Sequence, residues 1–304
     1  LDIAVKPRYV KSLYMKRKVY IVLAVAVPLS LFTGHEAVSQ TAKSLFWKSD
    51  GVQVEEIVSE EADQYRNVGH HGPAVENSHM ALRIYFNDSG AIDVYSKSGR
   101  GMDLEKYRWY PDSLARADYG AGCDEYVVGK TVGLGGIALW DGEKEVKLVA
   151  TEGRTARVGD TGKGAYAEMI AYGVPYNGDT LDVSIRIDVR DRSREAWVTA
   201  SVLDGTRVQF LTGVNWHEGA RVQSGDGYIS VWGVHPADVS AVPVPVGAGM
   251  FFSKGVFSAP EKTEDMVRII SRPSSRISTR IVAASTKEAE LNTAKRFEAY
   301  MQGD

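Results

Sequence analysis

The sequence predicts an all-β protein: a large antiparallel two-sheet sandwich closed by one C-terminal helix. Its composition, 44% hydrophobic and 25% charged, is that of an ordinary globular protein. Strand-like segments separated by short turns fill most of the chain, and helical periodicity is nearly absent before residue 285. The clearest strand is 180–190, where alternate residues are apolar and would lie on one face: Leu181, Val183, Ile185, Ile187 and Val189.

Two hairpins are expected in the first half of the chain. Residues 80–86 and 91–97 flank the turn sequence Asn87-Asp88-Ser89-Gly90. A second hairpin is expected over 136–150, with Asp141-Gly142 near its corner. The glycine-rich sequence GLGG at 133–136 leads directly into a strand, so it is interpreted as a turn rather than a phosphate-binding loop.

The second half is expected to continue as strands. Segments 180–190, 195–203 and 207–216 are separated by short turns and are predicted to form an antiparallel meander. A proline-rich segment, 236–249, is expected to be an extended edge or a loop within the domain. The other predicted strands are 164–174, 227–234, 249–257, 266–271 and 279–285.

A C-terminal helix is predicted after the last strand. Ser285 and Glu288 have the spacing of a capping box at the start of a helix. Ala294, Phe297 and Tyr300/Met301 would then lie on one face of that helix. This apolar face is expected to dock the helix on the sandwich.

Residues 15–39 have the features of a secretory signal. Lys16, Arg17 and Lys18 are followed by an apolar run that ends at Phe32, which is too short for a spanning helix. The small-x-small sequence at 37–39 is a cleavage site that would leave Gln40 first, and no cysteine follows for a lipid anchor. The alternative is a membrane anchor. The expected location is the periplasm or the outside of a Gram-negative cell.

The expected organisation has three parts. Residues 1–14 precede a plausible start methionine and are interpreted as translated upstream sequence, and 15–39 form the signal peptide. Residues 45–304 are expected to form a single β-sandwich domain, because no linker or repeat divides them. The lone cysteine, Cys123, cannot form an intramolecular disulfide.

Charge and motifs exclude several classes of function. Six of the 36 basic and two of the 39 acidic residues lie within 1–39, so the mature chain would have a net charge of −7. That opposes nucleic-acid binding but permits an anionic substrate in a locally basic cleft. Zinc-protease, serine-hydrolase, phosphate-loop and dinucleotide motifs are absent from the sequence, so neither a cofactor nor a metal is expected. No membrane partner is expected after signal cleavage, and the sequence does not give the oligomeric state.

The loop from Gly69 to Pro73 is the first candidate site. It holds His70 and His71 between residues with restricted or unusual backbone freedom, so an imidazole there would be fixed reproducibly. The alternatives are that both histidines cap strand ends, or that they bind zinc together with His79.

Other candidates are spread along the chain. The segment 103–112 interleaves aromatic and basic side chains, as expected for a wall that stacks on sugars and holds carboxylates, although edge-strand packing is the alternative. His217 ends a strand beside Trp216, which could be a core residue, and Asp124 lies in a glycine-rich turn that it could stabilise. The expected substrate-binding residues are Glu76, Arg100, Tyr107, Arg108, Trp109, Asp124, Lys130 and Trp216.

Three stretches of this sequence resemble a known family: HHGPAVENSHMALRIYFNDSGAIDVYSK from His70, WYPD from Trp109 and CDEYVVGKTVGLGGIALWDG from Cys123. They resemble an uncharacterised family of exported Bacteroidota proteins found beside polysaccharide-degrading enzymes, especially those acting on uronic-acid-containing glycans. The likeness runs from about Leu45 to the C-terminus and implies the galactose-mutarotase-like β-supersandwich. The context is also similar to that of oligosaccharide dehydratases acting on a terminal uronate. This chain departs in its short C-terminal half, which puts part of the cleft wall in doubt.

The residues and the resemblance together favour β-elimination on a uronate oligosaccharide. That reaction needs a neutralised carboxylate, a base for the C5 proton and an acid for the leaving oxygen. His71 is the expected base with His70 in support, Tyr110 the proton donor, Arg108 the carboxylate clamp and His217 the partner from the opposite wall. The alternatives are a mutarotase using His217 with Glu76 or Asp124, a glycoside hydrolase with Glu76 and Asp124 as its two acids, and a non-catalytic glycan-binding module.

Overall fold

A computed structural model describes residues 41–119, 121–237 and 242–303 of the chain. The predicted signal peptide and the upstream residues lie outside the described residues. The unit Ser39–Asp304 holds every described element, and nearly all of these are β-strands joined by turns. No helix within the described ranges is long and apolar enough to cross a membrane.

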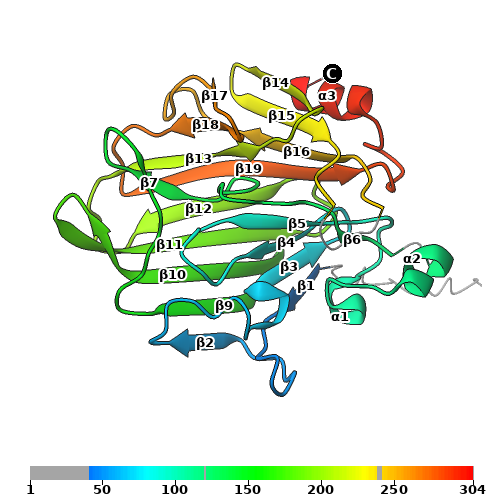
Figure 1. Cartoon of the computed structure of the whole chain (residues 1–304), viewed down its shortest axis with the longest axis horizontal. Helices are drawn as coiled ribbons and strands as arrows, with labels where there is room; N and C mark the ends of the chain where they lie inside the picture. Colours follow the sequence, from blue (N-terminus) through cyan, green and yellow to red (C-terminus); the bar gives the residue numbers. More distant parts are fainter. Residues whose placement is uncertain (1–40, 120, 238–241, 304) are drawn as a thin grey trace, which may run out of the picture. The chain divides into compact units, whose positions relative to one another are not determined.

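One layer is a nine-stranded antiparallel sheet (Figure 1). Its longest pairing joins β10 and β11, which run side by side over almost their whole length. The strand order is β14 (Arg221–Gly225), β15 (Tyr228–Gly233), β16 (Val246–Phe251), β19 (Arg276–Ser285), β12 (Ala196–Val202), β11 (Asp179–Arg190), β10 (Gly164–Tyr176), β9 (Arg154–Thr161) and β2 (Glu56–Ser59).

The second layer consists of two five-stranded sheets. The first has the order β1 (Thr41–Ser44), β3 (Ala74–Asn77), β4 (Ala81–Ile84), β5 (Ile92–Ser96) and β6 (Cys123–Asp124). The second has the order β17 (Glu261–Lys262), β18 (Met266–Ile270), β13 (Gln209–Asn215), β7 (Ala138–Trp140) and β8 (Glu145–Val146). Isolated bridges from Gly133 to Ile92 and from Leu134 to Val214 join the two sheets, so the GLGG turn is the link between them.

The hydrophobic core lies between the two layers. On β11 the apolar residues from Leu181 to Val189 are buried, whereas Arg186 and Asp188 are only half-buried and Arg190 is exposed on the other face. The predicted all-β sandwich is therefore confirmed, as are both predicted hairpins, which form as β4–β5 and β7–β8.

The predicted meander over 180–216 is wrong in its last strand. β11 and β12 pair as expected, but β13 pairs with β18 and β7 in the opposite layer. The free edge of β12 is occupied by β19, so the turn at Asp204-Gly205 carries the chain across to the other layer instead.

The C-terminal helix begins later than predicted. α3 spans Ala294–Gln302, and the side chain of Thr293 caps it by accepting from the Arg296 amide at 3.3 Å. Ser285 ends β19 instead, and Glu288 binds Arg194, so neither residue caps the helix. The docking prediction holds: Phe297 and Met301 pack against a satellite cluster that includes Trp232 of the nine-stranded sheet.

Two short helices follow β5. α1 (Leu104–Tyr107) and α2 (Ser113–Tyr119) occupy the region expected to be an aromatic wall or an edge strand. The buried carboxylate of Glu76 accepts from the amides of Asp103 and Leu104, which fixes the start of α1. Arg108 and Trp109 then adopt left-handed conformations, with φ of 48° and 75°, so this segment turns back instead of extending as a strand.

Candidate functional site

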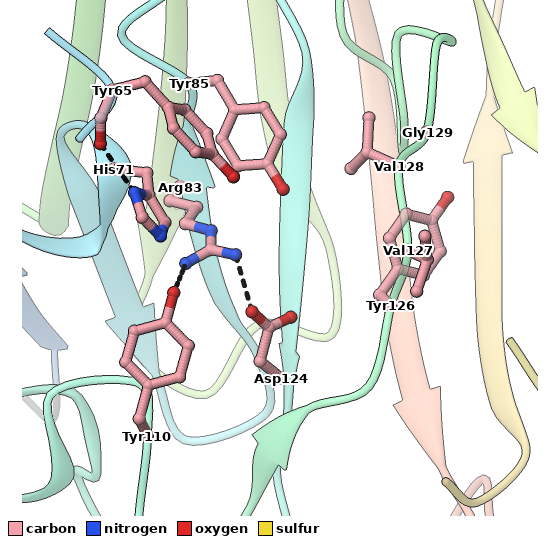
Figure 2. A pocket seen from close by; sticks show the side chains of 10 residues that line it. All are labelled: Tyr65, His71, Arg83, Tyr85, Tyr110, Asp124, Tyr126, Val127, Val128 and Gly129. Atoms are coloured by element: carbon pink, nitrogen blue, oxygen red, sulfur yellow. Dashed lines mark hydrogen bonds and ion pairs between the residues drawn. The ribbon is translucent and has the colours of Figure 1, made fainter. Parts of the chain in front are cut away.

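A polar cavity of about 400 Å³ opens beside the first five-stranded sheet. One wall comes from the loop before β3, from β4 and from the segments around α1 and β6, and the other from the chain that follows β6 (Figure 2). Its lining residues are Tyr65, His71, Arg83, Tyr85, Tyr110, Asp124, Tyr126, Val127, Val128 and Gly129.

Arg83 is the buried centre of this pocket. The β4–β5 hairpin places it directly opposite Asp93, and both side chains are almost fully buried. The guanidinium donates from Nε to Asp93 at 2.9 Å and from Nη2 to Asp124 at 2.8 Å, and Nη2 also binds Asp93. A buried guanidinium is stable only with such partners, so the two carboxylates hold it at the floor of the pocket.

Two tyrosines are tied to this charged group. Tyr85 donates its hydroxyl proton to Asp93 at 2.6 Å, whereas the Tyr110 oxygen accepts from Arg83 Nη1 at 3.0 Å. Burial raises the pKa of Tyr110, and the Arg83 charge opposes that rise. Tyr110 therefore keeps its proton at neutral pH, can donate it into the cavity, and would leave an oxyanion already bound to a cation.

His71 lies on the same wall with a defined tautomer. Its Nδ1 lies 2.6 Å from the Tyr65 carbonyl oxygen, and its ring stacks on the Tyr65 ring with centroids 4.0 Å apart. A carbonyl can only accept, so Nδ1 carries the proton. Nε2 is then unprotonated and faces the side of the pocket that holds Arg83 and Tyr110 (Figure 2).

The environment of His71 keeps it neutral. Burial is the main cause that lowers its pKa to about 4, and the nearby charges of Arg83, Lys48 and Arg66 lower it further. At neutral pH the ring therefore presents a free base to the cavity. Of these cations Arg83 is already paired with Asp93 and Asp124, so Lys48 and Arg66 are the ones that favour an anionic ligand beside the ring.

The loop that carries His71 is strained. His70 and His71 both have left-handed backbones, with φ of 55° and 61°. Phe86 donates its amide to the His71 carbonyl at 2.8 Å, and a Cβ on Gly72 would lie 1.9 Å from the Ile84 carbonyl oxygen. Two consecutive left-handed residues that are not glycine persist only where the surroundings fix them, and such strain is concentrated at functional sites.

The opposite wall is held from behind. The Val127 amide donates to His235 Nδ1 at 3.0 Å, and its carbonyl accepts from Asn215 at 2.7 Å and from His217 Nε2 at 3.0 Å. Burial is the main cause that lowers the pKa of His235 to about 3, so its ring is neutral and Nδ1 stays an acceptor. These side chains fix the backbone of the segment that faces His71.

The structure brings three of the expected site residues together: His71, Tyr110 and Asp124 all line the cavity. His70 lies behind the wall, 2% exposed, with Nε2 2.9 Å from the Ser44 hydroxyl. His217 does not face His71 from the opposite wall but contacts the back of that wall through Val127.

The expected substrate-binding residues lie mostly outside this cavity. Trp109 is fully buried with Arg83 4.5 Å above its ring, so it cannot stack on a sugar. Glu76 is sealed against Lys97, and Arg108 lies over Phe46. The remaining four, outside the lining, are Arg100, which pairs with Glu290; Tyr107, beneath Lys106; Trp216, beneath Lys262; and the exposed Lys130.

The centre of the site, Arg83 with its partner Asp93, was not among the residues expected from the sequence. Arg83 and Tyr85 occupy one face of the predicted strand 80–86, and Asp93 is placed opposite Arg83 by the predicted turn. The predicted hairpin could therefore have shown that Arg83 and Asp93 form an oppositely charged pair across its two strands. Tyr65, Tyr126 and His235 had no such signal, because their approach depends on the packing of distant segments. Within the described ranges, no cluster of three histidine, cysteine or acidic side chains could hold a metal ion.

Comparison with known proteins gives a family match. Residues 35–303 match the family described as "Domain of unknown function (DUF4861)". No curated protein matches the sequence. A crystal structure of 4-alpha-glucanotransferase from Thermococcus litoralis is similar over 77% of this chain and 42% of its own, with 10% identity and a TM-score of 0.34. The chain thus spans less than half of that protein, and a similarity of this size carries no argument about activity.

Proposed function

The chain belongs to this family, a domain of unknown function (DUF4861), and we propose that it acts on uronic-acid-containing oligosaccharides by β-elimination in the pocket of His71. One observation carries the proposal. A neutral imidazole with a free Nε2 and a tyrosine hydroxyl bound to an arginine face the same cavity, with ring centroids 6.2 Å apart. A base and an acid of this kind are what elimination requires.

The proposed reaction uses these two groups in sequence. His71 Nε2 takes the C5 proton of the uronate, the C4–O bond breaks as the C4=C5 bond forms, and Tyr110 protonates the leaving oxygen. The products are a 4,5-unsaturated uronate and an alcohol, or water if the leaving group is a hydroxyl. Arg83 stabilises the tyrosinate that forms, and a proton passed from His71 to Tyr110, directly or through water, restores the starting state.

The charges around the pocket support an acidic substrate. Arg83, Lys48 and Arg66 all lower the pKa of His71. Arg83 is already paired with Asp93 and Asp124, so the attraction for an anion would come from Lys48 and Arg66. Neutralisation of the uronate carboxylate makes the C5 proton more acidic, which helps a base of low pKa to remove it.

Two alternatives fit the pocket less well. A glycoside hydrolase of the usual kind needs two opposed carboxyl groups, but Asp124 is the only carboxylate among the residues that line the cavity. A mutarotase of the expected kind needs His217 and a carboxylate in one cleft, but His217 contacts the back of the wall through Val127 and does not line the cavity. Both of these assignments are therefore weaker than elimination.

The test is an ultraviolet assay on a panel of uronate-terminated oligosaccharides. Growth of the absorbance band of a 4,5-unsaturated uronate is the expected result, and loss of that signal in Tyr110→Phe would support Tyr110 as the acid. Reducing sugar released without that band would indicate hydrolysis and overturn the proposal. Binding without any turnover over the whole panel would indicate an accessory module instead.

A further inference from the structure

A row of aromatic and charged side chains crosses the outer face of the nine-stranded sheet. Direct strand pairing places Tyr166 opposite Asp188, Asp188 opposite Trp197, Trp197 opposite Arg280, and Arg280 opposite Phe251. The row therefore runs at right angles to β10, β11, β12, β19 and β16. Its aromatic members occupy every second strand, and charged members occupy the strands between them.

The spacing of this row is regular. Neighbouring strands lie about 4.8 Å apart, so successive aromatic side chains are separated by roughly 10 Å. One strand spacing is close to the length of a sugar ring along an extended polysaccharide. Alternate sugar rings of such a chain would meet an aromatic side chain, and the rings between them would meet a charged one.

Grooves lie on both sides of the central tryptophan. A groove of about 490 Å³ is lined by Trp197, Arg190 and Lys163, among others. A groove of about 350 Å³ is lined by Trp197, Phe251 and Arg280, among others. Trp197 therefore forms a wall shared by two grooves. Such an amphipathic ring offers an apolar face to the C–H surface of a sugar.

The tyrosine at one end of the row lies flat because of a glycine. Tyr166 pairs across the strands with Gly159, and a Cβ on that glycine would come within 2.4 Å of the tyrosine ring. The guanidinium of Arg186 lies over the face of this ring, 3.7 Å from its centre. Arg190 lies over the Trp197 ring in the same way, at 3.8 Å, and Arg280 lies over the Phe251 ring at 5.0 Å. Each ring therefore has a cation over one face, which would meet the carboxylates of an acidic polysaccharide. Trp197 lines both grooves, so it also borders the groove that Arg190 does not line.

The charges along the row favour an anionic ligand. Arg186 is paired with Asp188, and Arg280 with Glu195. Arg190 and Lys163 have no acidic partner within the described ranges, which leaves two cations at the Trp197 groove. The paired carboxylates of Asp188 and Glu195 would accept hydrogen bonds from sugar hydroxyls.

We propose that this row is a second carbohydrate-binding site, which holds an extended anionic polysaccharide across the outer face of the nine-stranded sheet. The site is independent of the His71 pocket, because none of its residues lines that cavity. It would keep the protein on a long acidic glycan while chain ends are processed elsewhere.

The experiment is native electrophoresis in gels that contain polygalacturonate or, separately, a neutral polysaccharide. We expect the wild-type protein to be retarded by the acidic polymer alone, and both Trp197→Ala and the exposed-site variant Arg190→Ser to lose at least half of that retardation. Trp140→Ala is the matched control, because Trp140 also lies beside an arginine, Arg268 at 4.9 Å, but in another sheet. It should migrate like the wild-type protein.

The melting temperature of each variant shows whether lost retardation comes from lost binding or from unfolding. If Trp197→Ala unfolds, Arg190→Ser alone tests the proposal. His71→Asn should be retarded like the wild-type protein whether or not the proposed elimination is correct. Equal retardation by the neutral polymer, unchanged retardation in both Trp197→Ala and Arg190→Ser, or no retardation of the wild-type protein would each overturn the proposal.

Discussion

Two buried charge clusters lie in the same five-stranded sheet, and they differ in what surrounds them. Glu76 and Lys97 form an ion pair whose carboxylate also accepts from two amides at the start of α1. Arg83 is also saturated by carboxylates, but it forms the floor of a cavity edged by His71 and Tyr110.

The Glu76 cluster is closed off by protein, whereas the Arg83 cluster borders a cavity. A buried charge alone does not indicate a site. Both clusters contain paired buried charges, and Glu76 and Arg83 lie on the neighbouring strands β3 and β4. What distinguishes the Arg83 cluster is that groups with available lone pairs or protons face an open space beside it. Variants of the two clusters test this distinction.

His71→Asn should abolish most activity without unfolding the protein. Asparagine tolerates the left-handed backbone at this position, so the loop should survive, but the general base is lost. The expected decrease in kcat/KM is about 100- to 10,000-fold. His79→Asn is the control, since His79 also has a pKa lowered to about 4 but lies outside the cavity. Similar losses in both variants would contradict the assignment.

Lys97→Met should have the largest effect on stability. It leaves the Glu76 carboxylate buried without its cation, which typically costs about 3–5 kcal/mol. Urea unfolding measures the change, and adding Glu76→Gln to the same chain should recover part of it. A loss below about 1 kcal/mol would mean that the sealed cluster does not stabilise the fold.

Tyr85→Phe should weaken the Arg83 cluster by a smaller amount. The hydroxyl donates to the Asp93 carboxylate, and a hydrogen bond to a charged group contributes about 1.5–3 kcal/mol. Urea unfolding should show that loss, and Tyr110→Phe should cost less stability because Tyr110 is 40% exposed. The reverse order of the two variants would show that Tyr110, not Tyr85, fixes the guanidinium.

Acid should destabilise the protein through its buried neutral histidines. Burial lowers the pKa of His70 to about 3, whereas an unfolded histidine has a pKa of about 6.5. The unfolded chain binds more protons between these values, so stability is fully present above pH 6.5 and is lost as the pH falls toward 3. Each such group contributes a slope of roughly 1.4 kcal/mol per pH unit. Urea midpoints at pH 6.5 and 4.5 should show a smaller difference in His70→Asn.

The sequence predicts one part of the molecule well and the other poorly, for a physical reason. Alternation along β11 and the turn between β4 and β5 specify strands and hairpins, because both depend on residues close in the chain. Glycine and proline around His70 and His71 likewise predicted the constrained loop, and that loop places His71 at the cavity. It could not show that Trp109 points into the core, because two left-handed residues reverse the chain there.

Tertiary contacts explain the remaining differences. The position of β13 was not predictable from its neighbours, since β19 takes the edge that β12 offers. His217 was singled out for its place at a strand end, and its position beside Val127 follows from the same change of layer. Tyr65 lies at the site through its carbonyl oxygen, which binds His71, and through its ring, which stacks on the His71 ring.

The hydrogen bonds that hold Val127 also bear on the order in which the two walls of the cavity form during biosynthesis. The wall that carries His71 and Tyr110 comes from residues 65–124, whereas the facing wall is held by Asn215, His217 and His235. A ribosome makes the first wall long before the residues that secure the second, and contacts over such separations form late. A growing or truncated chain that stops before His235 would therefore carry His71 without all of the contacts that hold the wall opposite it.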